Sequence, residues 1–156
     1  LSIMLRNKPG ALSRVTGLFS GRNFNIESLC VAETLNPEVS CLTLVTNGDA
    51  AIIEQITKQL HKLIDVATLS DISEGEYVER EMVLIRVKAD NITRAEVLRI
   101  IDIFRGKVVD VSPNSYALEI TGSESKISAV LDILRPIGIK EIVRTGKIAM
   151  KRAPKK

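Results

Sequence analysis

The sequence predicts an α+β protein built from two tandem ferredoxin-like units, each with the element order βαββαβ. Three observations support this fold class. Strand-like and helix-like apolar patterns follow one another in the same order in both halves. A polar stretch, residues 73–76, separates the halves, and the core is aliphatic, because the chain is 45% hydrophobic but only 3% aromatic. We therefore expect a first domain over 1–73, a linker over 74–80 and a second domain over 81–156.

In the first half, an apolar strand over residues 1–5 leads through a turn into a helix. The helix is indicated by apolar residues at the 3.6-residue period, from Leu12 to Phe19. A turn at Asn36-Pro37 separates two runs that are typical of antiparallel strands. The expected elements after the first helix are a strand over 24–33, a strand over 39–46, a helix over 52–63 and a strand over 64–72.

The second half repeats this order. Its first helix opens with a capping box, Thr93-x-x-Glu96, and a hairpin turns at Pro113-Asn114. Pro136 indicates that the last helix ends near Leu134. The expected elements are a strand over 82–89, a helix over 93–104, strands over 108–111 and 115–121, a helix over 124–134 and a strand over 139–144.

The turn between the first strand and the first helix suggests a small anionic ligand. The first N–H groups of a helix have no partner within it and lie at the positive end of its dipole, so they can hold a carboxylate. Gly10 allows a ligand to approach closely, and the Asn7 side chain offers both a donor and an acceptor, which suits an amino acid. Most turns of this kind bind nothing, so local sequence alone leaves both readings open.

The charge distribution argues against a general nucleic-acid-binding protein. The net charge is +3, but the basic residues gather at the C-terminal end, and the remainder of the chain is mildly acidic. We expect this end to be a solvated, frayed terminus. Six cations follow residue 143 without an acid among them: Arg144, Lys147, Lys151, Arg152, Lys155 and Lys156.

An RNA-recognition motif shares the βαββαβ order, but it stacks bases on aromatic residues of its central strands. Here only Phe24 and Tyr116 fall on expected strands, so we expect no nucleic-acid partner. No apolar stretch approaches the ~20 residues that cross a bilayer, and no leader pattern precedes a cleavage site. We therefore expect no membrane association and a cytoplasmic location.

The sequence offers little catalytic chemistry. Its one histidine, His61, lies at a lysine-flanked helix end, where a solvated position is expected. Cys30 and Cys41 lack metal-ligand spacing and are expected to be free, buried thiols. We therefore predict a binding protein without catalytic residues, metal or cofactor of its own. Four acids that alternate near Arg80 are interpreted as solvated: Glu74, Glu76, Glu79 and Glu81.

Four blocks of sequence carry a family resemblance. They are Asn7-x-x-Gly10-Ala11-Leu12-Ser13-Arg14-Val15-x-Gly17-Leu18-Phe19, Asn25-Ile26-Glu27-Ser28-Leu29, Gln59-Leu60-x-Lys62-Leu63-Ile64-Asp65-Val66 and Val78-Glu79-Arg80-Glu81. The first resembles a stretch shared by many ACT domains. Together the blocks resemble the small regulatory subunit family of acetolactate synthase (acetohydroxyacid synthase) over nearly the whole chain.

The resemblance implies an N-terminal ACT domain that pairs into a homodimer and binds a feedback effector, chiefly valine. It also implies a large catalytic subunit as partner, which holds thiamine diphosphate, Mg²⁺ and FAD and condenses pyruvate with a 2-oxo acid in branched-chain amino acid biosynthesis. The small subunit would activate that partner and make it subject to feedback. The alternative is a free-standing ACT amino-acid sensor that acts on another enzyme or on transcription.

The resemblance also implies effector contacts. We expect the turn at Gly10 to bind the effector carboxylate through the N–H groups of Ala11 and Leu12. Asn7 and Asn25 would bind the polar head of the ligand. The matching positions are Asn7, Gly10, Ala11, Leu12, Asn25, Ile26 and Ala32, the last three expected on the second strand.

The apolar wall of the expected site is formed by Ile26 and Ala32, against the branched side chain of the effector. One position departs from the family pattern, because Asn23 occupies a turn where glycine is usual. Asn tolerates positive φ better than other non-glycine residues, so we expect the turn to be kept.

Overall fold

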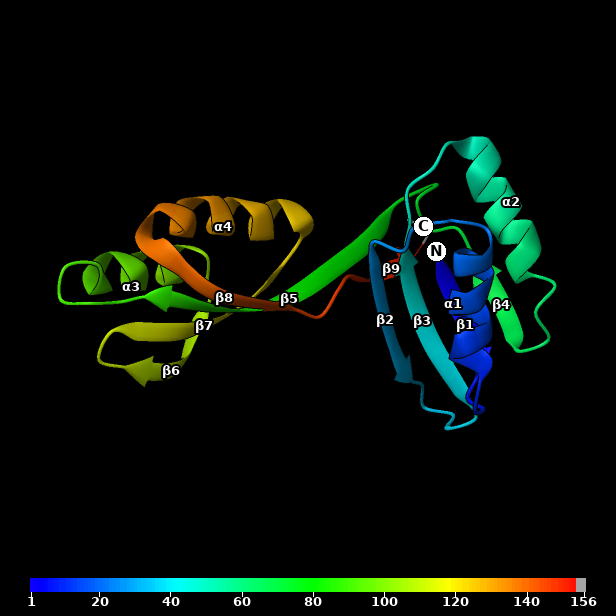
Figure 1. The fold of residues 1–156 in the computed structure, drawn as a ribbon, viewed down its shortest axis with the longest axis horizontal. Helices are drawn as coiled ribbons and strands as arrows, with labels where there is room; N and C mark the ends of the chain where they lie inside the picture. Colours follow the sequence, from blue (N-terminus) through cyan, green and yellow to red (C-terminus); the bar gives the residue numbers. More distant parts are fainter. Residues whose placement is uncertain (154–156) are drawn as a thin grey trace. The chain divides into compact units, whose positions relative to one another are not determined.

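The chain forms two compact units in a computed structural model that describes residues 1–153 (Figure 1). One unit consists of Leu1–Val78 and the C-terminal segment that starts at Lys147, and the other consists of Glu79–Gly146. Each unit has a separate cluster of buried apolar residues. Each unit therefore has a hydrophobic core of its own.

The first unit contains a four-stranded antiparallel sheet in the order β2-β3-β1-β4. This order and the chain path are those of a ferredoxin-like sandwich, as predicted. The elements are β1 (Ser2–Arg6), α1 (Ala11–Gly21), β2 (Ser28–Glu33), β3 (Val39–Val45), α2 (Ala50–Leu60) and β4 (Val66–Ser70).

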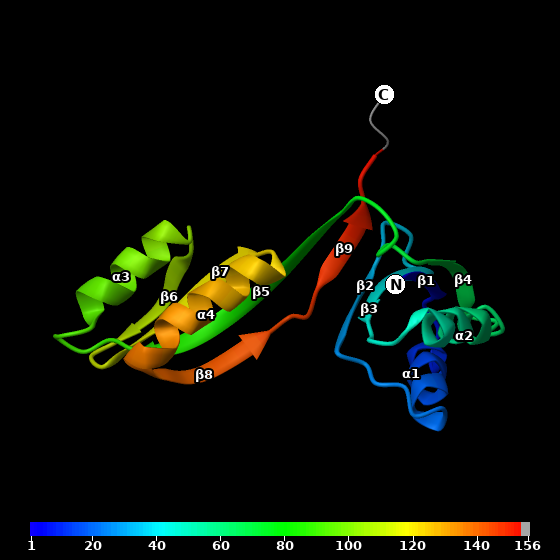
Figure 2. The same ribbon diagram turned by 90° about the horizontal axis from the view of Figure 1, so that it is seen from above.

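The core of the first unit lies between the sheet and its two helices, which cover the same face (Figure 2). Alternate residues of the central strands β1 and β3 point toward the helices, as the two-residue period of a strand requires. The α1 and α2 helices bury their apolar stripes against them. The fully or almost fully buried residues are Ile3, Leu5, Ala11, Val15, Phe19, Leu42, Leu44, Ile56 and Leu60.

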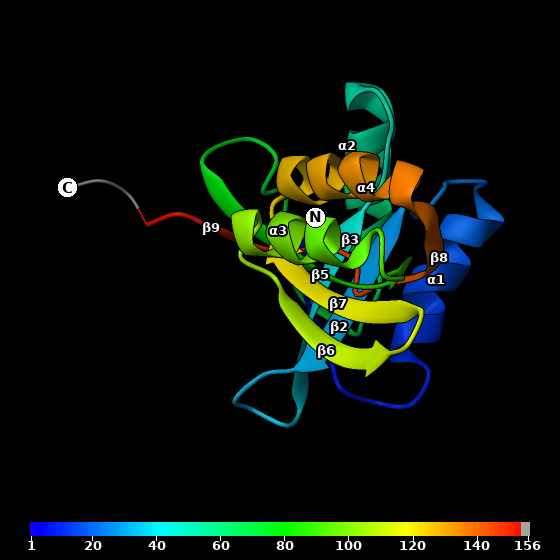
Figure 3. The same cartoon turned by 90° about the vertical axis from the view of Figure 1, so that its left-hand side faces the viewer.

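The second unit repeats the arrangement, with the sheet order β6-β7-β5-β8. Its helices lie side by side on one face of the sheet (Figure 3). Val83, Ile85 and Val87 of the central strand are completely buried. The elements are β5 (Tyr77–Lys88), α3 (Arg94–Ile103), β6 (Lys107–Ser112), β7 (Ser115–Gly122), α4 (Glu124–Gly138) and β8 (Ile139–Arg144).

The strand β5 begins at Tyr77, inside the stretch 74–80 that was expected to be a linker. The interpretation of Glu81 as a solvated acid is wrong. Only 4% of its surface is exposed, and its two carboxylate oxygens accept hydrogen bonds from Arg144 Nε and Nη2 at 2.9 and 2.7 Å. This two-pronged ion pair compensates for the desolvation of the carboxylate and joins β5 to the end of β8.

The helix α4 continues to Gly138, so the prediction that it ends near Leu134 is wrong. Pro136 lies inside its last turn. Proline lacks an N–H and therefore removes one helical hydrogen bond, but the interruption so close to the helix end affects few later bonds. The chain then passes directly into β8, which starts at Ile139.

The C-terminal segment is not a frayed tail over residues 148–151. These residues form β9 (Ile148–Lys151), which pairs with β5. Next to it, the Arg152 N–H donates to the Glu76 carbonyl at 2.9 Å. The segment belongs to the first unit, as does the start of β5 at Tyr77–Val78, whereas the sequence placed it in a second domain over 81–156. Lys155 and Lys156, also expected in the tail, lie outside the described residues.

Candidate functional site

The turn between β1 and α1 has the geometry of a helix N-terminus that its own chain leaves open. Gly10 adopts φ +83°, which favours glycine, and provides no side-chain cap. The Ala11 N–H is already used, because it donates to the Lys8 carbonyl at 3.1 Å. The expectation that the Ala11 N–H binds a carboxylate stays a prediction, and binding would have to compete with this hydrogen bond. The first-turn donors that lack a protein acceptor in the described part of the chain belong to Leu12 and Ser13.

Asn7, at the end of β1, is tied to the connection between β2 and β3. Its backbone N–H donates to Glu38 at 2.7 Å, and its Nδ2 donates both to Glu33 Oε1 and to the Pro37 carbonyl at 2.9 Å. The amide nitrogen thus already donates to two protein acceptors, and Oδ1 is the atom of this side chain that can accept a hydrogen bond from a ligand. Sequence reasoning missed Glu33, whose carboxylate lies beside Asn7; its place at the end of an expected strand gave only a weak signal.

Asn25 and Ile26 do not lie on the second strand, contrary to expectation, because β2 begins only at Ser28. They belong to the connection after α1, which is fastened to the end of β3. Thr46 Oγ1 donates to the Asn25 carbonyl at 2.6 Å, and the Glu27 N–H donates to the Val45 carbonyl at 2.9 Å. The side chain of Asn25 is exposed and Ile26 is half-buried, so both are accessible to a ligand.

The preceding turn contains Asn23 at φ +56°. This is the left-handed conformation that the sequence analysis expected Asn to tolerate in place of glycine. The departure from the family pattern at Asn23 therefore leaves the path of the chain into Asn25 intact.

Ala32 lies on β2 as expected, is exposed, and stands opposite Cys41 of β3. The strand β2 is at the edge of its sheet, where it pairs only with β3. Its other edge presents backbone N–H and C=O groups that can pair with a further strand. Cys30 stands opposite Thr43 on the same strand pair, and both cysteines are free but half-buried rather than fully buried.

The candidate residues fall into two groups at opposite ends of β2. Asn7 and Gly10 lie near its C-terminal end, next to Glu33, whereas Asn25 and Ile26 precede its N-terminal end. Glu33 lies seven positions after Ile26, which corresponds to roughly 23 Å along an extended chain. One amino-acid ligand cannot contact both groups within one protomer.

An ion pair fixes the start of α1 to the residue that precedes β4. Arg14 in the first turns of the helix binds the carboxylate of Asp65, which is 5% exposed and precedes β4. The Arg6 N–H also donates to the Asp65 carbonyl, at 2.8 Å. Asp65 thus holds the end of β1 and the start of α1 together, and this keeps the turn at Gly10 in place.

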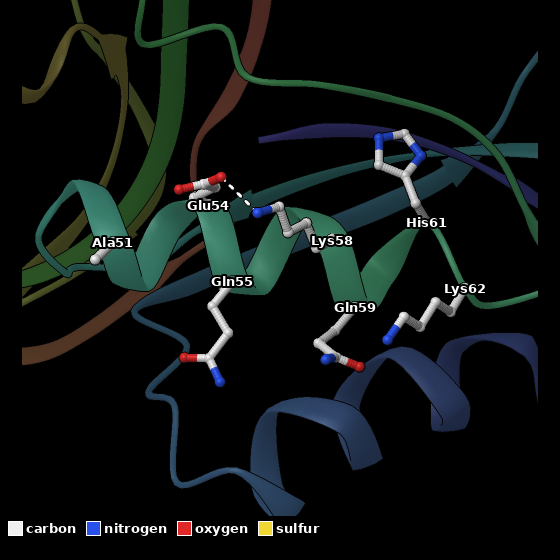
Figure 4. A pocket seen from close by; sticks show the side chains of 7 residues that line it. All are labelled: Ala51, Glu54, Gln55, Lys58, Gln59, His61 and Lys62. Carbon is white, nitrogen blue, oxygen red and sulfur yellow. Dashed lines mark ion pairs between the residues drawn. The ribbon is translucent and has the colours of Figure 1, made fainter.

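A shallow hollow on the outer surface of α2 has a different character (Figure 4). Glu54 and Lys58 form an exposed ion pair at 2.6 Å, which lowers the pKa of Glu54 mainly through the hydrogen bond from Lys58. His61 is exposed, as predicted. The hollow is lined by the mostly polar residues of a solvated helix surface: Ala51, Glu54, Gln55, Lys58, Gln59, His61 and Lys62.

Neither a metal-binding cluster nor a helix suited to crossing a membrane is found in residues 1–153. No cluster of three or more His, Cys, Asp or Glu side chains in this range is arranged to hold a metal ion. No helix in the same range combines the length and hydrophobicity that crossing a membrane requires.

The chain matches known proteins along its whole length. The family model for the AHAS small subunit-like ACT domain matches residues 1–68, and the model for the small subunit of acetolactate synthase matches residues 80–153. The chain is 49% identical to the probable acetolactate synthase small subunit of Archaeoglobus fulgidus, over 100% of this chain and 98% of the relative. It is 46% identical to the acetolactate synthase isozyme 3 small subunit of Escherichia coli, over 99% and 96% of the two chains.

A solved structure agrees with these relatives. The acetolactate synthase small subunit from Thermotoga maritima is 41% identical and superposes with a TM-score of 0.89, covering 98% of this chain and 96% of that one. The arrangement of two βαββαβ units is therefore common to both proteins. The chain belongs to the acetolactate synthase small-subunit family and carries its ACT domain at the N-terminal end.

Proposed function

We propose that the chain is the regulatory subunit of acetolactate synthase. It binds a branched-chain amino acid, chiefly valine, at the interface of two ACT domains, and it activates the large catalytic subunit and subjects it to feedback control. Family membership supports the large subunit as partner. The observation that carries the effector site is the separation of its two residue groups to opposite ends of β2.

This separation is resolved when two protomers pair along their β2 edges. An antiparallel two-fold pairing of edge strands sets the C-terminal end of one β2 beside the N-terminal end of the other. The turn at Gly10 of one protomer then meets Asn25 and Ile26 of its neighbour. Two equivalent sites result, and each is complete only in the dimer.

Within each site the chemistry suits a free amino acid. The N–H groups of Leu12 and Ser13 bind its carboxylate at the positive end of the α1 dipole. Asn7 Oδ1 and the Glu33 carboxylate accept hydrogen bonds from its ammonium group. Ile26 of the neighbouring protomer provides an apolar contact for the branched side chain.

The remaining expected contacts complete this site. Ala32, small and exposed on β2, leaves room for the branched side chain beside the interface, and the exposed amide of Asn25 adds a polar contact. The condensation itself takes place in the large subunit, which holds thiamine diphosphate, Mg²⁺ and FAD. This chain contributes control in valine, leucine and isoleucine biosynthesis, through a coupling of typically ~1–3 kcal/mol between effector site and partner.

The first test is co-purification with the large subunit, followed by an assay of acetolactate formation with increasing valine. We expect the chain to raise the activity of the large subunit and valine to lower it again. Valine at a hundred times its Kd should also stabilise the isolated chain by ~2.7 kcal/mol, which raises Tm by several degrees. Stabilisation by valine without any binding to the large subunit would instead indicate a free-standing sensor.

The shared site is tested by mixing two inactive variants. Gly10→Asp damages the turn, and Asn25→Ala damages the opposite segment. A mixed dimer has one site with both changes and one site with neither, so an equal mixture should recover valine binding at roughly a quarter of all sites. Calorimetry on the mixture measures this recovery. A site built within one protomer would recover nothing.

A further inference from the structure

A hydrogen bond joins the start of β2 to the C-terminal segment. The Lys147 N–H donates to Ser28 Oγ at 2.9 Å across 119 residues of sequence, in a half-buried position. Ser28 is the first residue of β2, and Lys147 directly precedes β9. Both residues belong to the first unit. The bond is therefore a long-range anchor at the entrance to the edge strand.

Ser28 follows the effector segment closely, since Asn25 and Ile26 are three and two residues before it. Two other hydrogen bonds of this segment, at Asn25 and Glu27, both lead to the end of β3. The Ser28 hydroxyl is different because it connects the segment to the C-terminal part of the first unit, which starts at Lys147. A ligand that orders Asn25 and Ile26 therefore also restricts the acceptor of this bond.

Hydrogen bonds also hold the backbone around Lys147, the donor of this bond. Gly146 adopts φ +81° and turns the chain before Lys147. On either side of this turn the chain is attached to β5 or its entrance: the Thr145 N–H donates to the Met82 carbonyl at 3.1 Å, and the Arg152 N–H donates to the Glu76 carbonyl at 2.9 Å. Backbone hydrogen bonds therefore hold the chain on both sides of Lys147.

We propose that Ser28 is the positioning residue through which effector occupancy at Asn25 and Ile26 reaches the C-terminal strand β9. This inference rests on the proposed function, because it requires an amino acid at those residues. Ordering of the effector segment strengthens the Ser28–Lys147 hydrogen bond and suppresses local opening of residues 147–151. Linkage makes the effect reciprocal, so loss of the bond weakens effector binding by the same factor by which it relaxes β9.

The test is hydrogen–deuterium exchange on the full chain with and without valine, together with calorimetry of valine binding. In the unchanged protein, valine should slow exchange over residues 147–151 by about two- to tenfold, the range expected for one hydrogen bond. Ser28→Ala should remove this protection and weaken valine binding by a similar factor. Ser28→Thr keeps the hydroxyl and should restore both. Ser128→Ala, at an exposed serine of α4, is the matched control and should change neither.

The outcomes separate this inference from the proposed function. Valine protection of residues 147–151 that persists in Ser28→Ala would overturn the role of Ser28, as would valine binding without any protection of β9 in the unchanged chain. Both results would leave the effector site standing. Calorimetry that detects no binding of any branched-chain amino acid would overturn the proposed function, and the inference with it.

Discussion

The two units share a fold but differ at the turn between their first strand and first helix. In the first unit, Gly10 caps α1 without a side chain, so the first-turn donors are left for an external group. In the second unit, the turn before α3 contains Asp90, whose Oδ1 accepts hydrogen bonds from the N–H groups of Ile92 and Thr93 at 3.0 and 2.9 Å. Neither helix has a side-chain cap at its N-terminus, but the turn of the second unit is held by a carboxylate of its own, whereas the turn at Gly10 is not.

The electrostatics of Asp90 agree with this difference. Its pKa lies well below the usual value for aspartate, first because of the hydrogen bond with the Lys88 ammonium and then because of the backbone donors of Thr93 and Ile92. Lys88 Nζ lies 2.9 Å from Asp90 Oδ2. A carboxylate is therefore the group that such a turn stabilises, and at Gly10 a ligand would have to supply it.

Gly10→Asp should have the largest effect, because it would provide the open turn with a carboxylate of its own. The new charge would compete with and repel the carboxylate of the effector, so we expect the valine affinity to fall at least about a hundredfold. Calorimetry on the variant measures the loss.

Gly10→Ala is the control for this prediction, since it has the same positive-φ strain without the charge. An added Cβ meets no atom within 4 Å, so the strain should lower stability by about 1 kcal/mol while valine still binds. Equal loss of valine binding in both variants would show that the backbone conformation at Gly10, and not the added carboxylate, weakens binding.

Glu81→Gln should have the next largest effect, on the stability of the second unit. Gln cannot reproduce the two-pronged ion pair with Arg144, and the acid is buried although Arg144 is partly exposed. We expect a loss of about 1–3 kcal/mol, seen as a Tm lower by several degrees. Glu141→Gln is the control, because its 3.5 Å pair with Arg86 is exposed and should matter little. Equal effects of the two changes would contradict the assigned role of Glu81.

Asp90→Ala should have a smaller effect on Tm than Glu81→Gln and should leave the valine response unchanged, because the self-satisfied turn binds no effector. The pH dependence has a definite sign. Since folding lowers the pKa of Asp90, its contribution to stability is fully present above the unfolded pKa of ~3.9 and is lost as pH falls through the folded value. Thermal melts between pH 7 and pH 2 should therefore show the Tm difference between the variant and the unchanged chain shrinking as the pH falls below ~3.9, without closing completely. A Tm difference that stays constant from pH 7 to pH 2 would contradict this role.

The sequence by itself determined which elements form, because strands and helices follow from local periods and turn residues. The 3.6-residue period from Leu12 to Phe19 predicted α1, and the apolar run over 82–89 predicted the second half of β5. The glycine turn at Gly10 was also visible as a candidate site, since a helix start without a capping side chain is a local property.

Tertiary structure alone decided which distant residues meet. Nothing local distinguishes Glu81 from its solvated neighbours, because its burial depends on Arg144, 63 residues away. The pairing of β9 with β5 and the bond between Ser28 and Lys147 are equally remote in sequence. Sheet register also placed Asn7 and Asn25 at opposite ends of β2. Local patterns determine the secondary structure of each segment, but its contact partners depend on packing across the whole chain. The residues of the candidate site could therefore be proposed from sequence, but their positions relative to one another could not.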